Sequence, residues 1–329
     1  MNNVLIVSPN WLGDAVMALP AIADVRRALP EATIAVSARA SVAPLFALVP
    51  DVEVPAGTRG FSPADCGSDA PFDTVILLPN SFHSAWTAYR AGIPNRWGYR
   101  TDWRGRLLTR AIPRPSRGHQ VEYYRHLVRE LGFPNGPSEP RLTVATERRD
   151  AAADVLAAAG WDRRSPLAAL APGAAYGGAK RWPPRSFAAL AGDLAADGVQ
   201  AVIVGSRADR ETTDAVLAAI QAGIARRPAP IDLTGRTDLP TLAAVLTHCR
   251  ALVTNDSGAM HVGAAVGVPV TAVFGPTDES STRPIGDAHR VLTHDVWCRP
   301  CMLRECPIDH RCMRRIGVAA VAGAARRTL

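Results

Sequence analysis

The chain has 329 residues, of which 47% are hydrophobic and 20% are charged, with a formal net charge of +7. This length is about twice that of a common domain, so we expect two domains, each with a sizeable core. No apolar run reaches the roughly 18 residues that span a bilayer, and the N-terminal MNNVLIVSPN has neither the basic leader nor the apolar length of a signal peptide, so the sequence predicts a cytoplasmic protein.

Predicted strands and helices alternate in the first half of the chain. The apolar runs at 3–8, 33–37 and 74–78 have the length and composition of buried strands. The first run ends in a break at 9–14, and a helix with apolar residues at helical spacing follows as far as residue 29. Pro20 should kink this helix near its second turn. This alternation predicts a parallel sheet with both faces covered.

Arginine supplies most of the positive charge, since Lys180 is the one lysine among 37 basic residues. The stretch from Arg90 to Arg129 holds ten arginines and two acids, Asp102 and Glu122. Such a region attracts an anionic partner. Acidic membrane headgroups and a phosphorylated glycolipid both fit, whereas no signature of a nucleic-acid-binding module is present, so we expect no nucleic acid partner. A solvated basic face is the alternative interpretation.

The strongest break in the chain is the stretch 132–140, which contains three prolines and two glycines. After it we expect a short strand at 142–145 and a helix at about 147–159. Alternation then resumes, with strands at 166–170 and 199–204 and helices at about 185–196 and 210–222. The sequence therefore predicts an α/β protein with two doubly wound, Rossmann-like domains, 1–160 and 161–329, which face each other across a ligand-binding cleft.

The most informative stretch is LVTNDSGAMHVGAAVGVPVTAVF, residues 252–274. A strand at 251–254, a polar turn, a helix of small residues at 259–266 and a second strand at 270–274 form a βαβ unit. Its turn lies at the carboxyl edge of a parallel sheet, where such folds bind ligands. The start of the helix favours an anion, most often a phosphate. The alternative is that Asp256 or Ser257 only caps the helix.

Two other turns carry candidate catalytic groups. Asp14 follows Gly13 at the start of the first helix, where a carboxylate stays ionised and can act as a general base. The alternative for Asp14 is a simple N-cap. Lys180 ends the glycine-containing loop PGAAYGGAK, which is not a P-loop but has the composition of a phosphate cradle. An ammonium there suits a diphosphate, and a solvated loop lysine is the alternative.

Weaker candidates lie next to these turns. His261 either donates to a phosphate or is a core histidine, and Asp209 is placed to accept hydrogen bonds from ribose or sugar hydroxyls. The chain has no Asp-x-Asp pair of the kind that holds a nucleotide diphosphate through a divalent cation. We therefore expect a site that requires neither metal nor cofactor, in which Lys180 and helix N-termini neutralise the leaving diphosphate.

Four of the six cysteines lie close together in sequence, at Cys298, Cys301, Cys306 and Cys312. This spacing permits tetrahedral zinc, but a single C-x2-C lacks a clean second pair. Reduced structural thiols are equally compatible with a chain that has no secretory signal. We predict no metal here, and the zinc alternative stays open.

Four segments, in chain order, carry a resemblance to a known family: SPNWLGD, PGAAYGGAKRWP, TNDSGAMHVGAAVGVPVTAVFGPT and WCRPCMLRECPIDHRCM. Together they resemble the bacterial ADP-heptose:lipopolysaccharide heptosyltransferases of glycosyltransferase family 9, and the last segment is most similar to the heptosyltransferase II group. The resemblance implies a GT-B fold with an acceptor-binding N-terminal domain and a donor-binding C-terminal domain. We also expect the C-terminal helix to pack back on the first domain. The resemblance also implies peripheral contact with the cytoplasmic face of the inner membrane.

The activity implied by the resemblance is inverting transfer of heptose from ADP-heptose to the first heptose of the lipopolysaccharide inner core. Matched to the family's motifs, Asp14 is the implied catalytic base and Lys180 the implied contact to the donor diphosphate. Other members carry Thr or Ser where this chain has Ala174 and Ala175, and we expect Tyr176 to compensate. The implied donor-binding residues are Tyr176, Lys180, Asp209, Asp256, Ser257, Gly258 and His261. The expected acceptor-binding residues are Asn10, Trp11, Gly13, Arg96, Arg100 and Arg104, with Arg106 nearby.

Other classes of function remain open on the sequence. A nucleotide-sugar epimerase uses a similar two-domain fold but needs no acceptor. An oxidoreductase is disfavoured because the first strand lacks Gly-x-Gly-x-x-Gly. A non-catalytic protein that binds a nucleotide sugar or a lipid is the third alternative, and the presence of both Asp14 and Lys180 speaks against it.

Overall fold

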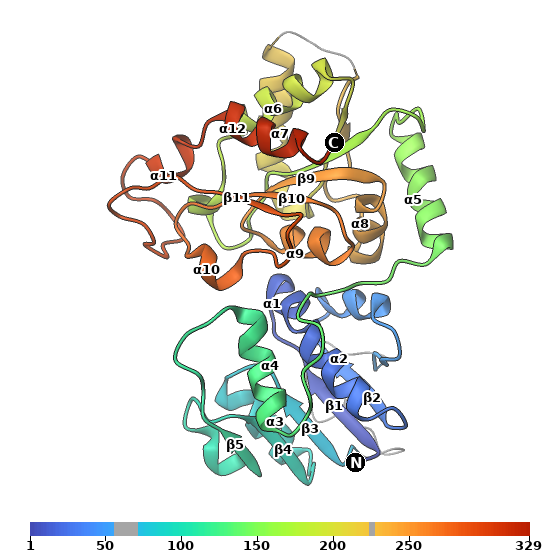
Figure 1. Ribbon diagram of the computed structural model, residues 1–329, viewed down its shortest axis with the longest axis vertical. Coiled ribbons are helices and arrows are strands. Elements are labelled where there is room, and N and C mark those ends of the chain that lie inside the picture. The colour runs from blue at the N-terminus through green and yellow to red at the C-terminus, as the bar shows by residue number, and fades with distance from the viewer. Residues whose placement is uncertain (56–71, 224–227) are drawn as a thin grey trace. The chain divides into compact units, whose positions relative to one another are not determined.

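The computed structural model describes residues 1–55, 72–223 and 228–329 (Figure 1). The chain divides into two compact units, Met1–Thr143 and Val144–Leu329. This division lies one helix before the expected boundary at residue 160, because α5 (Thr146–Ala158) packs against α8 (Leu239–Leu246). No helix within the described ranges has the length and apolar character to cross a membrane.

The first unit is built on a five-stranded parallel sheet with the strand order β2-β1-β3-β4-β5. Its strands are β1 (Asn3–Val7), β2 (Thr33–Ser37), β3 (Thr74–Leu77), β4 (Asn95–Tyr99) and β5 (Arg110–Ile112). Its helices are α1 (Leu12–Met17), α2 (Leu19–Ala28), α3 (Phe82–Arg90) and α4 (Gln120–Glu130), with 3-10 turns η1 (Ala43–Leu48) and η3 (Arg104–Leu107).

Both faces of this sheet are buried, as alternation along β1 shows. Leu5 and Val7 pack in a core cluster with Ala85 and Ala88 of α3, and Ile6, which points to the opposite face, is also buried. The helices α1, α2 and α4 pack against one another. The sequence therefore predicted the doubly covered parallel sheet correctly.

The helix that was expected to kink at Pro20 is divided into two helices. The helix expected after the first strand is two helices, α1 and α2, which meet at Ala18. Pro20 lies in the first turn of α2, where its missing N–H costs no intrahelical hydrogen bond. The break shortens α1 to 6 residues, and its first turn directly follows the loop after β1.

The second unit is built on a six-stranded parallel sheet with the order β11-β10-β9-β6-β7-β8. Its strands are β6 (Leu167–Ala171), β7 (Gln200–Ile203), β8 (Ile231–Asp232), β9 (Cys249–Asn255), β10 (Val270–Val273) and β11 (Arg290–Leu292). Its helices, besides α5 and α8, are α6 (Pro184–Ala196), α7 (Arg210–Ala222), α9 (Gly258–Ala265), α10 (Glu279–Thr282), α11 (Arg311–Arg314) and α12 (Val318–Arg326). The 3-10 turns are η4 (Gly178–Lys180) and η5 (Arg207–Asp209).

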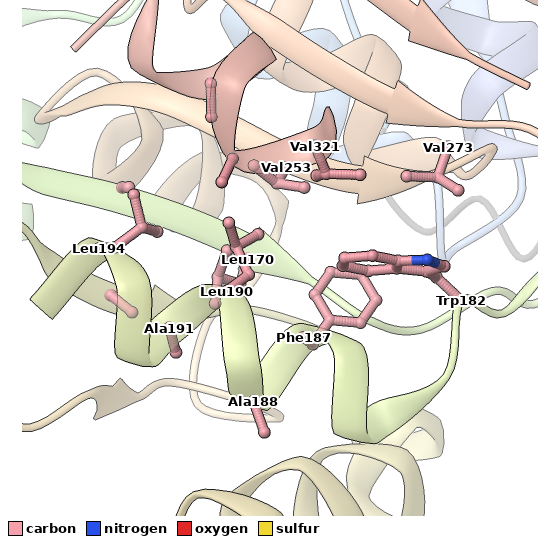
Figure 2. Close-up of a cluster of buried hydrophobic side chains, with 14 of the residues drawn as sticks. Leu170, Trp182, Phe187, Ala188, Leu190, Ala191, Leu194, Val253, Val273 and Val321 are labelled. Atoms are coloured by element: carbon pink, nitrogen blue, oxygen red, sulfur yellow. The ribbon is translucent and has the colours of Figure 1, made fainter. Parts of the chain in front are cut away.

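One core cluster joins the sheet of the second unit to α6 and α12 (Figure 2). The rings of Trp182 and Phe187 meet edge to face, with centroids 5.1 Å apart, and Trp182 Nε1 donates to the carbonyl of Ile316. The last helix, α12, packs against α6, β9 and β10, and Arg326 pairs with Asp197. These contacts anchor α12 within the second unit, and its expected packing on the first domain stays a prediction.

One expected strand is absent from the structure, and three strands were not expected. Residues 142–145 form no strand, and Thr143 makes a single backbone hydrogen bond to the carbonyl of Leu48. The strands β4, β5 and β11 were not predicted, because charged and polar residues interrupt them (NRWGY, RAI and RVL) and they lie near or at sheet edges. These segments are strands because they form backbone hydrogen bonds with neighbouring strands, and the local sequence pattern does not reveal such pairing.

Each sheet has one point at which the strand order reverses. In the first unit this point lies between β1 and β3, where the loop after β1 leads into α1. In the second unit it lies between β6 and β9, so the loops that follow these two strands meet at the carboxyl edge. Open parallel sheets bind ligands at such points.

Candidate functional site

The side chain of Lys180 is held at the switch point of the second unit. Its Nζ lies 2.5 Å from Asp256 Oδ2, and Thr277 Oγ1 donates to the same oxygen at 2.7 Å. The ammonium also lies 4.6 Å from the centroid of the Tyr176 ring. Because the Lys180 side chain is only 13% exposed, it is not the solvated loop lysine of the alternative interpretation.

Asn255 connects the loops that carry Lys180 and Asp256. Its fully buried amide donates to the carbonyls of Pro172 and Gly173, at 2.8 and 3.3 Å, and accepts from Trp182 N at 2.9 Å. These three bonds hold the loop after β6 against the end of β9. Sequence analysis treated Asn255 as a turn residue and missed this role, although a buried amide between two loops is a recurrent means of satisfying backbone groups.

The start of α9 is free of a side-chain cap from its N-cap residue. Ser257 holds the N-cap position, but its Oγ pairs with Thr254 Oγ1 at 3.1 Å and makes no cap hydrogen bond. The carboxylate of Asp256 faces Lys180 and Thr277. The capping alternative for these two residues is therefore wrong. The first-turn N–H groups of a helix have no intrahelical acceptors, so the turn that contains Gly258 keeps the anion-binding character of a helix N-terminus.

Two of the weaker donor-side candidates have structural duties. Asp209 Oδ2 accepts from both Ser206 N and Ser206 Oγ and closes a capping box on η5. Asp209 also lies so close to Gly173 that a Cβ there would collide with it, so this glycine permits the two loops to meet. His261 is 6% exposed and belongs to the buried side of α9, which favours the core interpretation over a phosphate contact.

The cysteine-rich segment docks on the glycine loop of Lys180. Met302 O accepts from Tyr176 Oη at 2.7 Å, and Arg304 O accepts from Ala179 N at 2.9 Å. Glu305 Oε1 accepts from Gly178 N at 2.8 Å, and His310 Nε2 lies 2.6 Å from the carbonyl of Ala179. Tyr176 is thus a brace between the two segments, with its hydroxyl already engaged.

The four cysteines of this segment are free thiols. The pKa of Cys312 is raised, first by burial and then by the other three thiols nearby. Over the described part of the chain, no group of three or more His, Cys, Asp and Glu side chains is arranged to hold a metal ion. The predicted absence of a metal stays a prediction, and the role that the structure gives the segment is to fix the loop.

Asp14 lies at the switch point of the first unit. It is the third residue of α1, whose N-cap is Trp11, so Asp14 is not the N-cap of the alternative interpretation. Its charge, after burial, contributes to raising the pKa of Tyr124 on α4, which packs against α1. The side chain is half-buried, beside the exposed Asn10 and Trp11. A carboxylate in a first turn is stabilised as the anion.

The arginines expected to bind an acceptor fall into different environments. Arg104 is completely buried and donates to the carbonyls of Pro79 and Tyr99 and to Ser84 Oγ. Burial lowers its pKa to about 10. A direct contact between Arg104 and an acceptor is therefore not available in this structure, and its role is to join the loops after β3 and β4.

Arg96 is also engaged, whereas Arg100 and Arg106 are exposed. Arg96 donates to the carbonyls of Ile93 and Leu107 at 2.6 and 2.7 Å, at the amino end of β4 and away from the carboxyl edge. Only Arg100 and Arg106 of this set are open to an anion. The sequence predicted the positive charge of this region, but not which guanidinium groups are engaged in hydrogen bonds within the fold.

Comparison with known proteins decides the family. Residues 68–311 match glycosyltransferase family 9 (heptosyltransferase). The chain is 31% identical over 308 residues to lipopolysaccharide heptosyltransferase 2 of Escherichia coli K12, which covers 88% of this chain and 87% of that protein. The chain belongs to glycosyltransferase family 9.

The solved structures agree with this family. The structure of E. coli ADP-heptose LPS heptosyltransferase II matches with a TM-score of 0.82 and 30% identity, over 100% of this chain and 98% of that one. E. coli heptosyltransferase WaaC with ADP matches in fold, with a TM-score of 0.75 and 18% identity, over 99% and 100% of the two chains. The predicted GT-B type of fold, with two parallel α/β sheets, is confirmed.

Family 9 membership makes this chain a glycosyltransferase, which removes the epimerase, oxidoreductase and non-catalytic alternatives. The region that matches the family contains the loop of Lys180, the turn at Asp256 and most of the cysteine-rich segment. It does not contain Asp14, which lies before residue 68. Roles for individual residues in this family 9 enzyme therefore rest on its own geometry.

Proposed function

We propose that this protein transfers heptose from ADP-heptose to the first heptose of the lipopolysaccharide inner core, with inversion at the anomeric carbon and without a metal ion. The observation that carries the proposal is the Lys180–Asp256–Thr277 cluster beside the uncapped start of α9, in a chain that belongs to the heptosyltransferase family. The relatives' names supply the donor and the lipopolysaccharide acceptor.

In this proposal the second unit binds the donor. Lys180 supplies a positive charge and the start of α9 supplies N–H groups, so together they suit the two phosphates of ADP. Asp256 holds the ammonium in place through an ion pair. A preorganised cation that need not reorient stabilises the charge that develops on the leaving diphosphate.

The first unit supplies the base. The acceptor hydroxyl attacks the anomeric carbon of the heptose from the face opposite to ADP, the bond from that carbon to the phosphate oxygen breaks, and Asp14 accepts the hydroxyl proton. ADP leaves with the electron pair of the broken bond. A single displacement of this kind inverts the anomeric centre. Arg100 and Arg106 provide exposed positive charge for the phosphates and acidic sugars of the acceptor. We also place the enzyme at the cytoplasmic face of the inner membrane, where a lipid-anchored acceptor lies.

The direct test combines two acceptors with mass measurement of the product. Purified protein is incubated with ADP-heptose and either a core acceptor that ends in one heptose or a core that lacks heptose. We expect one added heptose on the first acceptor only, and the anomeric configuration of the product, determined by NMR, to be opposite to that of the donor. Addition to the heptose-free core would contradict the proposed acceptor, and retention of configuration would contradict the single displacement.

Asp14→Asn tests the base. The variant should lose about 10²–10⁴-fold in kcat, while ADP-heptose binds normally, because the amide cannot accept the proton. Glu31→Gln, which removes an exposed acid of the same unit, is the matched control and should keep normal kcat. Near-normal turnover of Asp14→Asn would remove Asp14 from this role.

A further inference from the structure

An exposed row of aromatic side chains lies on α3 of the first unit. Phe82, Trp86 and Tyr89 are 43%, 41% and 50% exposed. Their spacing of four and three residues places them on one face of the helix, and their rings stack, with centroids 6.3 Å apart for Phe82–Trp86 and 5.8 Å for Trp86–Tyr89. Aromatic groups of this size are normally buried, so a contiguous exposed row marks an interaction surface.

A further exposed aromatic side chain lies on the loop that contacts the start of α3. Trp103 is 96% exposed and has a left-handed backbone, with φ of 58°. The adjacent Asp102 accepts from Phe82 N at 2.6 Å, which ties this loop to the start of α3. Arg104, the next residue in this loop, is fully buried and donates to the carbonyl of Pro79 and to Ser84 Oγ. Phe82, Trp86, Tyr89 and Trp103, here called the aromatic surface, are therefore presented on a rigid support.

Positive charge accompanies the aromatic surface. The exposed guanidinium of Arg90 lies 5.9 Å from the ring of Trp86, and the turn η3, which packs against α3, carries the exposed Arg106. Asp102 is the only acid between residues 80 and 120, and its carboxylate is already bonded to Phe82 N. The face that the rings occupy is thus cationic at its edges and apolar at its centre.

We propose that the aromatic surface is the membrane-docking site of this enzyme and that its partner is a bilayer of anionic phospholipid. Trp and Tyr favour the boundary between headgroups and acyl chains, and guanidinium groups next to them suit the phosphates of the headgroups. The inference rests on the proposed function in one respect: a lipid-anchored acceptor gives the first unit a reason to meet a membrane. An anionic bilayer matches both parts of this surface, because its acyl-chain boundary accepts the aromatic rings and its headgroup phosphates pair with the guanidinium groups.

Vesicle flotation without acceptor or donor tests the proposal. The full chain is mixed with phosphatidylcholine vesicles or with vesicles that also contain phosphatidylglycerol. We expect co-flotation with the anionic vesicles, weakened by high salt, and little with the neutral ones. The double variant Trp86→Ala, Trp103→Asn should lower partitioning about tenfold or more, since alanine suits the helix and asparagine tolerates the left-handed backbone.

Two controls keep the result specific. Trp297→Ala removes a tryptophan that is 77% exposed in the second unit and should float like the unaltered protein. Arg90→Gln should weaken binding to anionic vesicles alone. The proposal is overturned if the unaltered protein stays off anionic vesicles, if the double variant floats as well as the unaltered protein, if flotation requires the acceptor glycolipid in the vesicle, or if the double variant changes the oligomeric state instead.

Transfer to a deacylated, water-soluble core acceptor separates this inference from the proposed function. The double variant should retain normal kcat and KM with that acceptor, which also shows that it is folded, and should lose activity only with acceptor in vesicles. Flotation without transfer would leave the membrane site standing and remove the proposed function. Transfer to the soluble acceptor without flotation would support the proposed function and overturn the membrane-docking site.

Discussion

Lys180 combines a unique chemistry with a fixed position. It is the single lysine of the chain, and its ammonium is placed by an ion pair, a hydrogen-bonded neighbour and an aromatic ring rather than left in solvent. Tyr176, whose ring lies beside the Lys180 ammonium, also donates a hydrogen bond to the cysteine-rich segment. The position of this single charge therefore depends on the glycine loop and on a segment that is distant in the chain.

This uniqueness allows a chemical test of donor binding. An amine-acetylating reagent has one ε-amino group to modify, apart from the N-terminus, and ADP should slow modification of Lys180 and the accompanying loss of activity. Lys180→Ala should raise the KM for ADP-heptose and lower kcat, together about 10²–10³-fold in kcat/KM. Peptide mass measurement and donor titration check both. Unchanged donor affinity in Lys180→Ala, or acetylation that ADP does not slow, would count against the assignment.

Arg104 is the counterexample at the same scale, a charge that looks functional in sequence and is structural in the fold. Arg104→Ala should lower the free energy of unfolding by about 2–4 kcal/mol, because three carbonyls and a hydroxyl lose their donor and a cavity remains. Denaturant melts measure the loss. Arg106→Ala, in the same 3-10 turn but exposed, should stay within about 0.5 kcal/mol. Equal stabilities of the two variants would show that the Arg104 contacts contribute nothing.

At the scale of elements, the donor side of the site is a junction of two strand-end loops. The loops after β6 and β9 come together because their strands are neighbours in the sheet, although Pro172 and Asn255 lie 83 residues apart in the chain. Sequence analysis identified both loops from glycine content and polar turns. It could not identify Asn255 as the link between them, because pairing across the sheet is a long-range property.

Asn255→Ala tests this junction. Three buried backbone groups would lose their partner, so the variant should be destabilised by about 2–4 kcal/mol and should bind ADP more weakly. Thermal unfolding and ADP titration measure the two effects, and Gln221→Ala, at an exposed position of α7, is the control. Normal ADP affinity in a folded Asn255→Ala protein would separate the junction from donor binding.

At the scale of the whole molecule, the excess of positive charge affects association with an anionic acceptor. The Debye length falls from about 10 Å at 0.1 M salt to about 3 Å at 1 M, so the KM for the acceptor should rise severalfold across this range. Arg100→Gln should reduce that dependence, whereas Arg148→Gln, exposed on α5 of the second unit, should leave it unchanged. Initial rates at several salt concentrations check this. If the KM for the acceptor does not change with salt concentration, the arginines form a solvated basic face that does not bind the acceptor.

The sequence by itself determined the α/β class, the two-unit organisation, the breaks that end the first strand and its helix, and the three turns that carry Asp14, Lys180 and Asp256. These follow from local periodicity, from glycine and proline, and from the motifs around the turns. Tertiary structure alone decided which strands are neighbours, that α5 belongs to the second unit, that Arg104 is buried, and that a cysteine-rich segment holds the loop of Lys180. These depend on which surfaces meet after the chain folds, and that information is not contained in any one stretch of residues.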